Sequence, residues 1–254
     1  MRLSPRLDLI VLVLCTATVA ACGTDDTAPQ ARTVTVFAAA SLTDAFTDLG
    51  DAFEQTFPNV DVVLNFAASS DLVTQIGQGA PVDVFASADE ANMTRLTDTG
   101  GMAGRPSVFA TNRAAILVEA GNPQGITGIA DLADPDLIVV VCSPEVPCGR
   151  YAQQVFDNAG VAVVPRSFEE NVKAVVSKVT LGEADAGIVY VTDVIAAGDR
   201  AQGVEIAPDV NVVARYPIAV TAQAADPPGA QAFIDFVVSD AGRAVLASYG
   251  FGPP

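Results

Sequence analysis

The sequence predicts an α/β protein in which parallel β-sheets carry helices on both faces. Apolar, β-rich runs alternate with amphipathic helical runs along the chain. Half of the 254 residues are hydrophobic, which suffices for a sizeable core. The length fits one large domain or two lobes of roughly 100 to 150 residues each. We therefore expect two α/β lobes.

A β-α-β-α-β unit is predicted at the start of the first lobe. Its strands are expected at residues 33–39, 60–66 and 82–86. The helix predicted over residues 43–56 follows from apolar residues at helical spacing, and the second helix is marked in the same way by Leu72, Val73 and Ile76.

The second lobe is predicted as an insertion into the first. Its expected strands are 114–118, 137–141 and 186–190, with helices near 151–159 and over 170–181. The chain then returns through a strand at 216–221 and helices at 229–239 and 241–249. Crossings near Thr111 and Ala214 give a first lobe of residues 33–111 plus 214–254 and a second lobe of residues 112–213.

The N-terminus is typical of an export signal. Arg2 and Arg6 precede an apolar run over residues 9–21, which is too short for a permanent membrane span. Small residues then lead into Cys22, as in a bacterial lipobox, so residues 1–21 are a predicted signal peptide and Cys22 a predicted lipid anchor. Residues 22–32 are a predicted polar tether. An ordinary signal peptide with an incidental cysteine is the alternative. We expect the chain to be exported and anchored to the outer face of the cell membrane.

Composition excludes several classes of function. The formal net charge is −17, so nucleic acid is not an expected partner. The chain contains no histidine, which removes Ser-His-Asp and Cys-His catalysis and the commonest zinc and iron ligand. We therefore expect no enzyme, no cofactor and no bound metal cation.

Two of the four cysteines remain after the signal peptide and the proposed anchor are set aside. Cys142 and Cys148 close a short loop, and in an exported protein such a pair is most simply a disulfide. Redox catalysis is the alternative, but five intervening residues are not the C-x-x-C spacing.

Serines follow the predicted strands of the first lobe. Ser41, with Asp44 three residues later, has the form of a helix capping box; Ser69 with Ser70, and Ser87, repeat the arrangement. Each alone is most simply a helix cap. Because the carboxyl ends of parallel strands share one crevice, Ser41 and Ser69 are also expected to face each other as part of an uncharged anion site.

The second lobe offers matching groups. The run from Pro147 to Tyr151 opens a helix whose first N–H groups, at Cys148 and Gly149, could face a ligand. Asn171 and Val172 open another helix. Tyr190 ends a buried strand with a hydroxyl that needs a partner, either a ligand or the backbone. Arg150 is a possible ligand clamp, although a solvated position on the helix face is the simpler interpretation.

These segments resemble the molybdate-binding proteins of ABC transporters. The resemblance covers most of the chain from Thr33 onward and is carried by VFAAASLTDAF (36–46), NFAASSDLVTQIGQGAPVDVFASAD (65–89), VPCGRYA (146–152), ENVKAVVSKVTLGEADAGIVYVTD (170–193), YPIAV (216–220) and SYGF (248–251). It implies a type II periplasmic-binding-protein fold with a ligand cleft between two lobes, and an ABC transporter permease as partner.

The resemblance also implies a set of ligand contacts. The hydroxyls of Ser41, Ser69 and Tyr190 and the backbone N–H groups of Cys148 and Val172 would bind the oxyanion. The family usually has alanine at the position of Cys148 and lacks the Cys142–Cys148 pair. A backbone contact tolerates this difference, and a disulfide would hold the loop in place.

Donor-only groups suit a fully ionised tetrahedral dianion such as molybdate or tungstate. Sulfate or another oxyanion is the alternative within the binding class, because sulfate has the same charge pattern. A secreted hydrolase is the alternative enzyme, but it lacks a histidine base and a G-x-S-x-G elbow. A structural surface lipoprotein would need no crevice. We expect a monomer.

Overall fold

Nine strands and eight α-helices alternate along residues 32–254, the part of the chain that the computed structural model describes. The predicted signal peptide, Cys22 and the tether up to residue 31 lie outside the described residues. The strands are β1 (Arg32–Ala39), β2 (Val60–Ala67), β3 (Val84–Ala86), β4 (Ser107–Glu119), β5 (Val139–Cys142), β6 (Ser167–Glu169), β7 (Ala186–Tyr190), β8 (Ala201–Glu205) and β9 (Val213–Val220). The α-helices are α1 (Thr43–Thr56), α2 (Ser69–Gly77), α3 (Glu90–Thr97), α4 (Pro147–Ala159), α5 (Val172–Thr180), α6 (Val191–Ala197), α7 (Pro227–Val237) and α8 (Asp240–Ser248). Short 3-10 helices are η1 (Ala40–Leu42), η2 (Ile129–Ala133) and η3 (Gly198–Arg200).

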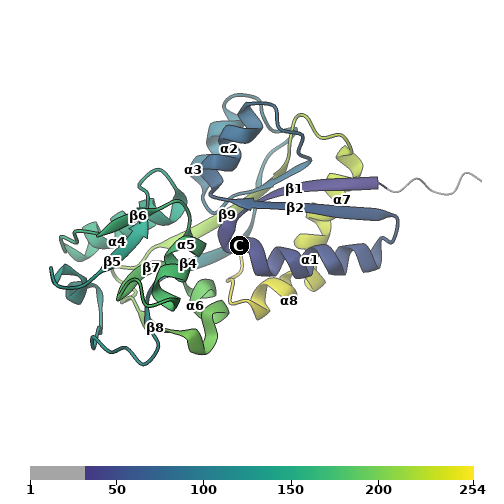
Figure 1. Ribbon diagram of the computed structural model, residues 1–254. Helices are drawn as coiled ribbons and strands as arrows, with labels where there is room; N and C mark the ends of the chain where they lie inside the picture. The colour runs from purple at the N-terminus through teal and green to yellow at the C-terminus, as the bar shows by residue number, and fades with distance from the viewer. Residues whose placement is uncertain (1–31) are drawn as a thin grey trace, which may run out of the picture. The chain divides into compact units, whose positions relative to one another are not determined.

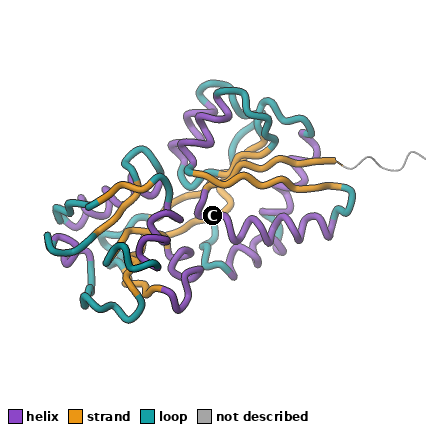
Figure 2. The backbone as a smooth tube through the Cα atoms, viewed as in Figure 1, coloured by secondary structure: helices purple, strands orange, loops and turns teal. Residues whose placement is uncertain are grey.

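Strand β1 lies at the centre of the first parallel set, between β2 and β3. Its side chains alternate between the two faces of the sheet, as the pleat requires. Val34 and Val36 belong to the core cluster that includes α1 and α7, whereas Phe37 packs with residues of α2. Figures 1 and 2 show α1 along one side of these strands and α2 on the other. Both faces of the set are therefore covered.

Strand β5 has the same place in a second parallel set, between β6 and β7. Helices α4 and α5 pack on these strands (Figure 1). In both sets, a helix follows the carboxyl end of each strand or begins a few residues later. These helices are η1, α2 and α3 in the first set and α4, α5 and α6 in the second. Ligand crevices in open α/β sheets form at such ends.

Strands β4 and β9 connect the two parallel sets. They pair with each other in antiparallel register, with a bulge between Val108 and Ala110. Strand β9 also pairs with β3, and β4 pairs with β7 and β8. The sheet therefore contains both parallel and antiparallel pairs of strands, because β4 leads from the first parallel set to the second and β9 leads back in the opposite direction.

The predicted α/β class is confirmed, while some elements differ from expectation. Strand β4 starts at Ser107, before the predicted apolar run, because it pairs with β9 along that part. Strands β6 and β8, which are short and largely polar, were not predicted. The division into lobes at residues 112 and 213 stays a prediction. No helix in residues 32–254 is long and apolar enough to cross a membrane.

Candidate functional site

One cavity gathers residues from the carboxyl ends of both parallel sets. The predicted positions Ser41, Ser69, Cys148, Val172 and Tyr190 all line it. Its other lining residues are Ala39, Ala40, Ala68, Ala88, Pro147 and Asn171. Among the described residues, this lining contains no charged side chain, although the chain as a whole is strongly acidic.

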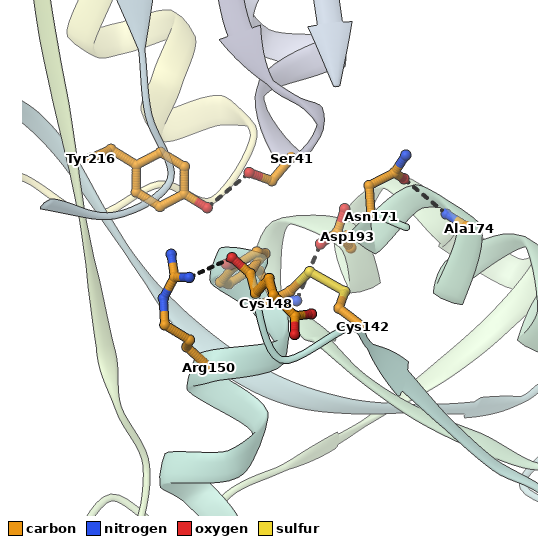
Figure 3. Close-up of a disulfide and its surroundings, with 10 residues drawn as sticks. Ser41, Cys142, Cys148, Arg150, Asn171, Ala174, Asp193 and Tyr216 are labelled. Carbon is orange, nitrogen blue, oxygen red and sulfur yellow. Dashed lines mark hydrogen bonds between the residues drawn. A yellow bond between two sulfur atoms is a disulfide. The ribbon is translucent and has the colours of Figure 1, made fainter. Parts of the chain in front are cut away.

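Ser41 does not cap a helix, contrary to the capping-box expectation. It lies within η1, and the N-cap of α1 is Leu42, which makes no side-chain capping bond. The Ser41 Oγ atom instead lies 2.9 Å from the hydroxyl of Tyr216, and both groups are buried. Figure 3 shows these two hydroxyls pointing toward each other. The inserted 3-10 turn therefore turns Ser41 away from the α1 backbone.

Ser69 does not act as the expected helix cap either. It is the first residue of α2, and its Oγ accepts a hydrogen bond from Ala88 N at 3.0 Å. Because the hydroxyl accepts from Ala88, its own hydrogen stays available for a ligand in the cavity. This bond also ties the end of β2 to the end of β3.

The other two serines have no capping role. The Ser70 Oγ atom is buried and has no hydrogen-bond partner in the described part of the chain, and the Ser87 Oγ atom accepts from Asp89 N at 3.3 Å. The N-cap of α3 is Asp89, whose carboxylate accepts from Asn92 N. A carboxylate therefore takes the capping position that the sequence pattern assigned to Ser87.

The loop before α4 is closed by a disulfide between Cys142 and Cys148, with a Cα–Cα distance of 5.7 Å (Figure 3). Pro147 opens the helix, where its missing N–H costs nothing. At Gly149 the backbone approaches the loop so closely that a Cβ atom would lie 2.0 Å from the Ser143 carbonyl oxygen. The first turn of α4 is thus held against the loop at the edge of the cavity.

Helix α5 presents Val172 to the cavity through its first turn. The side chain of Asn171 caps the helix by accepting from Ala174 N at 3.1 Å, also drawn in Figure 3. The backbone N–H of Val172 lies in the first turn, where helices have no internal acceptor. Asn171 therefore fixes the helix start without occupying that donor.

Tyr190 ends β7 with its hydroxyl buried and without a hydrogen-bond partner among residues 32–254. Burial, followed by the neighbouring Tyr216, raises the pKa of Tyr190 well above its usual value, so the hydroxyl keeps its proton. A buried unpaired hydroxyl that lines a cavity fits an acceptor-rich ligand, because an unmet donor costs about 1–3 kcal/mol.

Arg150 is not positioned as a ligand clamp. It does not line the cavity, and its guanidinium pairs with Asp89 and donates to the Glu145 carbonyl oxygen. The pair joins α4 to the N-cap of α3 beside the cavity. Arg150 keeps a partly solvated place on α4, with 32% of its side chain exposed, and it also has a buried partner in Asp89.

Comparison with known proteins agrees with this arrangement. Residues 34–252 match the family of bacterial extracellular solute-binding proteins. The chain belongs to this family. The molybdate-binding protein ModA of Mycobacterium tuberculosis is 42% identical over 252 residues, covering 96% of this chain and 97% of the relative. ModA of Escherichia coli is 31% identical over 228 residues, covering 86% of this chain and 88% of the relative. The resemblance to molybdate-binding proteins of ABC transporters is thereby confirmed.

Solved structures show the same fold. The periplasmic molybdate-binding protein of Azotobacter vinelandii superimposes with a TM-score of 0.75 at 23% identity, covering 87% of this chain and 99% of that chain. The sulfate-binding protein SubI of M. tuberculosis gives a TM-score of 0.79 at 21% identity, covering 87% of each chain. At these identities the likeness concerns the fold alone, and it confirms the predicted fold of periplasmic binding proteins.

Sequence reasoning missed Tyr216 and Asn112 in this solute-binding protein. Tyr216 was expected only as part of an apolar strand, and it lies fully buried on β9 against Ser41. Asn112 on β4 donates from Nδ2 to Thr192 Oγ1 at 2.9 Å. Each contact joins residues 80 or more positions apart, so no local pattern signals them. Within residues 32–254, no cluster of three or more Cys, Asp or Glu side chains could hold a metal ion.

Proposed function

We propose that this solute-binding protein captures molybdate, and also tungstate, and delivers it to an ABC transporter permease. Ser41, Ser69 and Tyr190 would donate hydroxyl hydrogens to the oxyanion, and Cys148 and Val172 would donate backbone N–H groups. The observation that carries the proposal is that these five residues, from separate elements, line one cavity that has no charged side chain in its lining.

The chemistry of the lining supports a fully ionised oxyanion. Such an anion only accepts hydrogen bonds, so each hydroxyl and N–H can satisfy it, and a carboxylate would repel it. Charge-assisted hydrogen bonds of about 1.5–3 kcal/mol each compensate for the loss of hydration. Three helices, α2, α4 and α5, begin at or next to the cavity, and their positive ends favour negative charge.

The predicted lobes supply donors from opposite sides. Ser41 and Ser69 belong to residues 33–111, and Cys148, Val172 and Tyr190 belong to residues 112–213. Contacts to both lobes favour a closed arrangement when the anion binds, and a permease would recognise that arrangement. The strands β4 and β9, which run between the two parallel sets, are the candidate hinge.

The location is part of the same proposal. Residues 1–21 would direct export, and a lipid on Cys22 would keep a monomeric protein at the outer face of the cell membrane. Intact-mass measurement of the protein purified from membranes, with Cys22→Ser as control, tests this point. A wild-type mass without an acyl modification would refute the anchor and leave the binding proposal intact.

Calorimetry with molybdate, tungstate, sulfate and phosphate tests the ligand. We expect Ser41→Ala and Tyr190→Phe each to weaken molybdate binding about tenfold or more, on the scale of one charge-assisted hydrogen bond. Tyr249→Phe is the matched control, because the Tyr249 hydroxyl bonds to Asp48 outside the cavity. Unchanged affinity in both site variants would refute the site, and stronger binding of sulfate than of molybdate would assign the protein to sulfate.

A further inference from the structure

The ion pair between Arg150 and Asp89 crosses from one predicted lobe to the other beside the cavity. Asp89, the N-cap of α3, belongs to the first predicted lobe, and Arg150, in the first turn of α4, belongs to the second. Asp89 follows the lining residue Ala88, and Arg150 lies two residues after the lining residue Cys148. Figure 3 shows Arg150 beside the disulfide-bonded Cys148. Neither charged side chain lines the cavity, so the pair can act on a bound anion only through its neighbours.

Each partner is held by its own lobe through an atom that takes no part in the pair. Arg150 donates from Nη1 to the Glu145 carbonyl oxygen, and Asp89 accepts from Asn92 N through Oδ1 at 2.9 Å. The crossing contact uses the other two atoms, Arg150 Nη2 and Asp89 Oδ2. Both groups are therefore oriented before the lobes meet, and less conformational entropy is lost when the pair forms.

The pair is also sheltered from water. The side chain of Asp89 is 6% exposed and that of Arg150 is 32% exposed. Solvent ions screen such a pair much less than an exposed one. Separation of the lobes has to break this contact, whereas an anion that enters an open cleft meets neither partner. The pair is therefore placed to act on release of the anion rather than on its capture.

We propose that Arg150 is a positioning residue of the anion site, which pairs with Asp89 across the closed cleft and so sets how long the anion stays bound. The inference rests on the proposed function and adds to it the contact that keeps the donors of the two lobes together.

The residues next to the pair contact two of the proposed anion donors. On the side of the first lobe, Ala88 N donates to Ser69 Oγ at 3.0 Å. On the side of the second lobe, the ring of Tyr151 packs edge-on against Tyr190, with ring centroids 6.2 Å apart. Loss of the pair would therefore loosen both walls of the cavity while every donor to the anion is still present.

Release of radioactive molybdate, chased with unlabelled molybdate, tests the role of Arg150. We expect Arg150→Gln to release molybdate about tenfold faster than wild type, because removal of one partner of a sheltered charge pair acts mainly on dissociation. The association rate constant, obtained from the release rate and the calorimetric affinity, should change by less than about twofold. Arg150→Lys keeps the charge and should recover much of the slow release.

Arg166→Gln is the matched control. Arg166 lies in the same predicted lobe and donates to the carbonyl oxygen of Pro135, as Arg150 does to that of Glu145. Among the described residues, Arg166 forms no ion pair with the first lobe. The control therefore removes the same charge and the same kind of carbonyl contact, but no crossing pair.

Asp89→Asn shows whether Arg150 acts through Asp89. Asparagine keeps an oxygen that can accept from Asn92 N, because it caps helices as well as aspartate does, and it removes the charge. The double variant with Arg150→Gln should release molybdate about as fast as either single variant, and additive effects would overturn the inference. If Asp89→Asn fails to fold, the comparison of Arg150→Gln with Arg166→Gln decides.

The remaining outcomes separate this inference from the proposed function. Equal release rates in Arg150→Gln and Arg166→Gln would overturn the role of Arg150, and so would an affinity loss that comes from slower association alone. If Arg150→Gln lowered the melting temperature of the ligand-free protein more than Arg166→Gln does, the pair would be a general stabilising contact, and the inference would fail. Wild-type protein that binds sulfate in place of molybdate overturns the proposed ligand, and the same chase with radioactive sulfate then tests the pair.

Discussion

Lys173 on α5 and Asp44 on α1 form an ion pair with a distance of 2.8 Å between Nζ and Oδ2. Lys173 follows the cavity residue Val172, and Asp44 lies three residues after Ser41. The pair therefore connects the two predicted lobes directly beside the candidate site. Lys173 also lies 3.4 Å from the buried carboxylate of Asp193.

Lys173→Met is expected to weaken molybdate binding about two- to fivefold. Both members of the Lys173–Asp44 pair are partly exposed, and such pairs contribute at most about 1 kcal/mol. Raised salt should reduce the difference from wild type, because it screens the pair. Lys178→Met is the matched control, since Lys178 pairs with Glu169 inside the predicted second lobe. Equal losses in the two variants would show that the connection between lobes has no special role.

Asp193 gives the protein a pH-dependent stability. Burial raises the pKa of Asp193 from 3.8 to about 6, and the nearby Lys173 opposes this rise. A carboxyl whose pKa is raised in the folded state stabilises the fold fully below its unfolded pKa. That contribution is lost as the pH increases through the folded pKa. Between about pH 4 and pH 6, wild-type protein should therefore lose up to about 3 kcal/mol of stability relative to Asp193→Asn. Denaturant unfolding at several pH values measures this difference, and a constant difference would contradict the prediction.

The disulfide between Cys142 and Cys148 should stabilise the fold and position a ligand donor. It closes a loop with a sequence separation of 6, for which chain entropy predicts about 2 kcal/mol. We expect reductant to lower the melting temperature and to weaken molybdate binding, because the Cys148 N–H is then less well held. The double variant Cys142→Ala with Cys148→Ala should no longer respond to reductant. Wild type and double variant responding alike would rule out the disulfide as the cause.

Gly149→Ala is expected to displace the first turn of α4. The added Cβ atom would meet backbone oxygens of Ser143 and Cys142 at 2.0 and 2.7 Å, and backbone cannot move aside as a flexible side chain can. Overpacking of this kind costs about 1–3 kcal/mol. Gly104→Ala, where nothing lies within 4 Å of the added atom, is the control. Denaturant unfolding should show a clear loss in the first variant and little change in the second.

Local patterns in the sequence predicted where the cavity residues lie but not how they act. Ser41 and Ser69 follow parallel strands, and the rule that such strand ends share one crevice brought them together. Their hydroxyl partners, Tyr216 and Ala88, come from other elements, so the capping pattern was misleading. Arg150 pairs with Asp89, which lies 61 residues away in the sequence, and no local pattern indicates such a pairing.

The fold could be predicted where strands are apolar and buried. Strand β7, buried along its whole length, matched its predicted bounds. Strands β6 and β8 were not predicted from the sequence. Each pairs with a single neighbour at the margin of the sheet and carries mostly polar or small residues. Pairing with a strand distant in sequence, rather than local hydrophobicity, makes them strands.

The position of β9 between β3 and β4 has a consequence for the order of folding. A nascent chain that ends at residue 205 contains every other strand, yet β3 is paired on the β1 side only and the first half of β4 lacks its partner β9. Unpaired strand edges invite aggregation. The three parallel strands of the first set are complete by Ala86, but the edge of β3 that pairs with β9 stays uncovered until residue 220 has been synthesised.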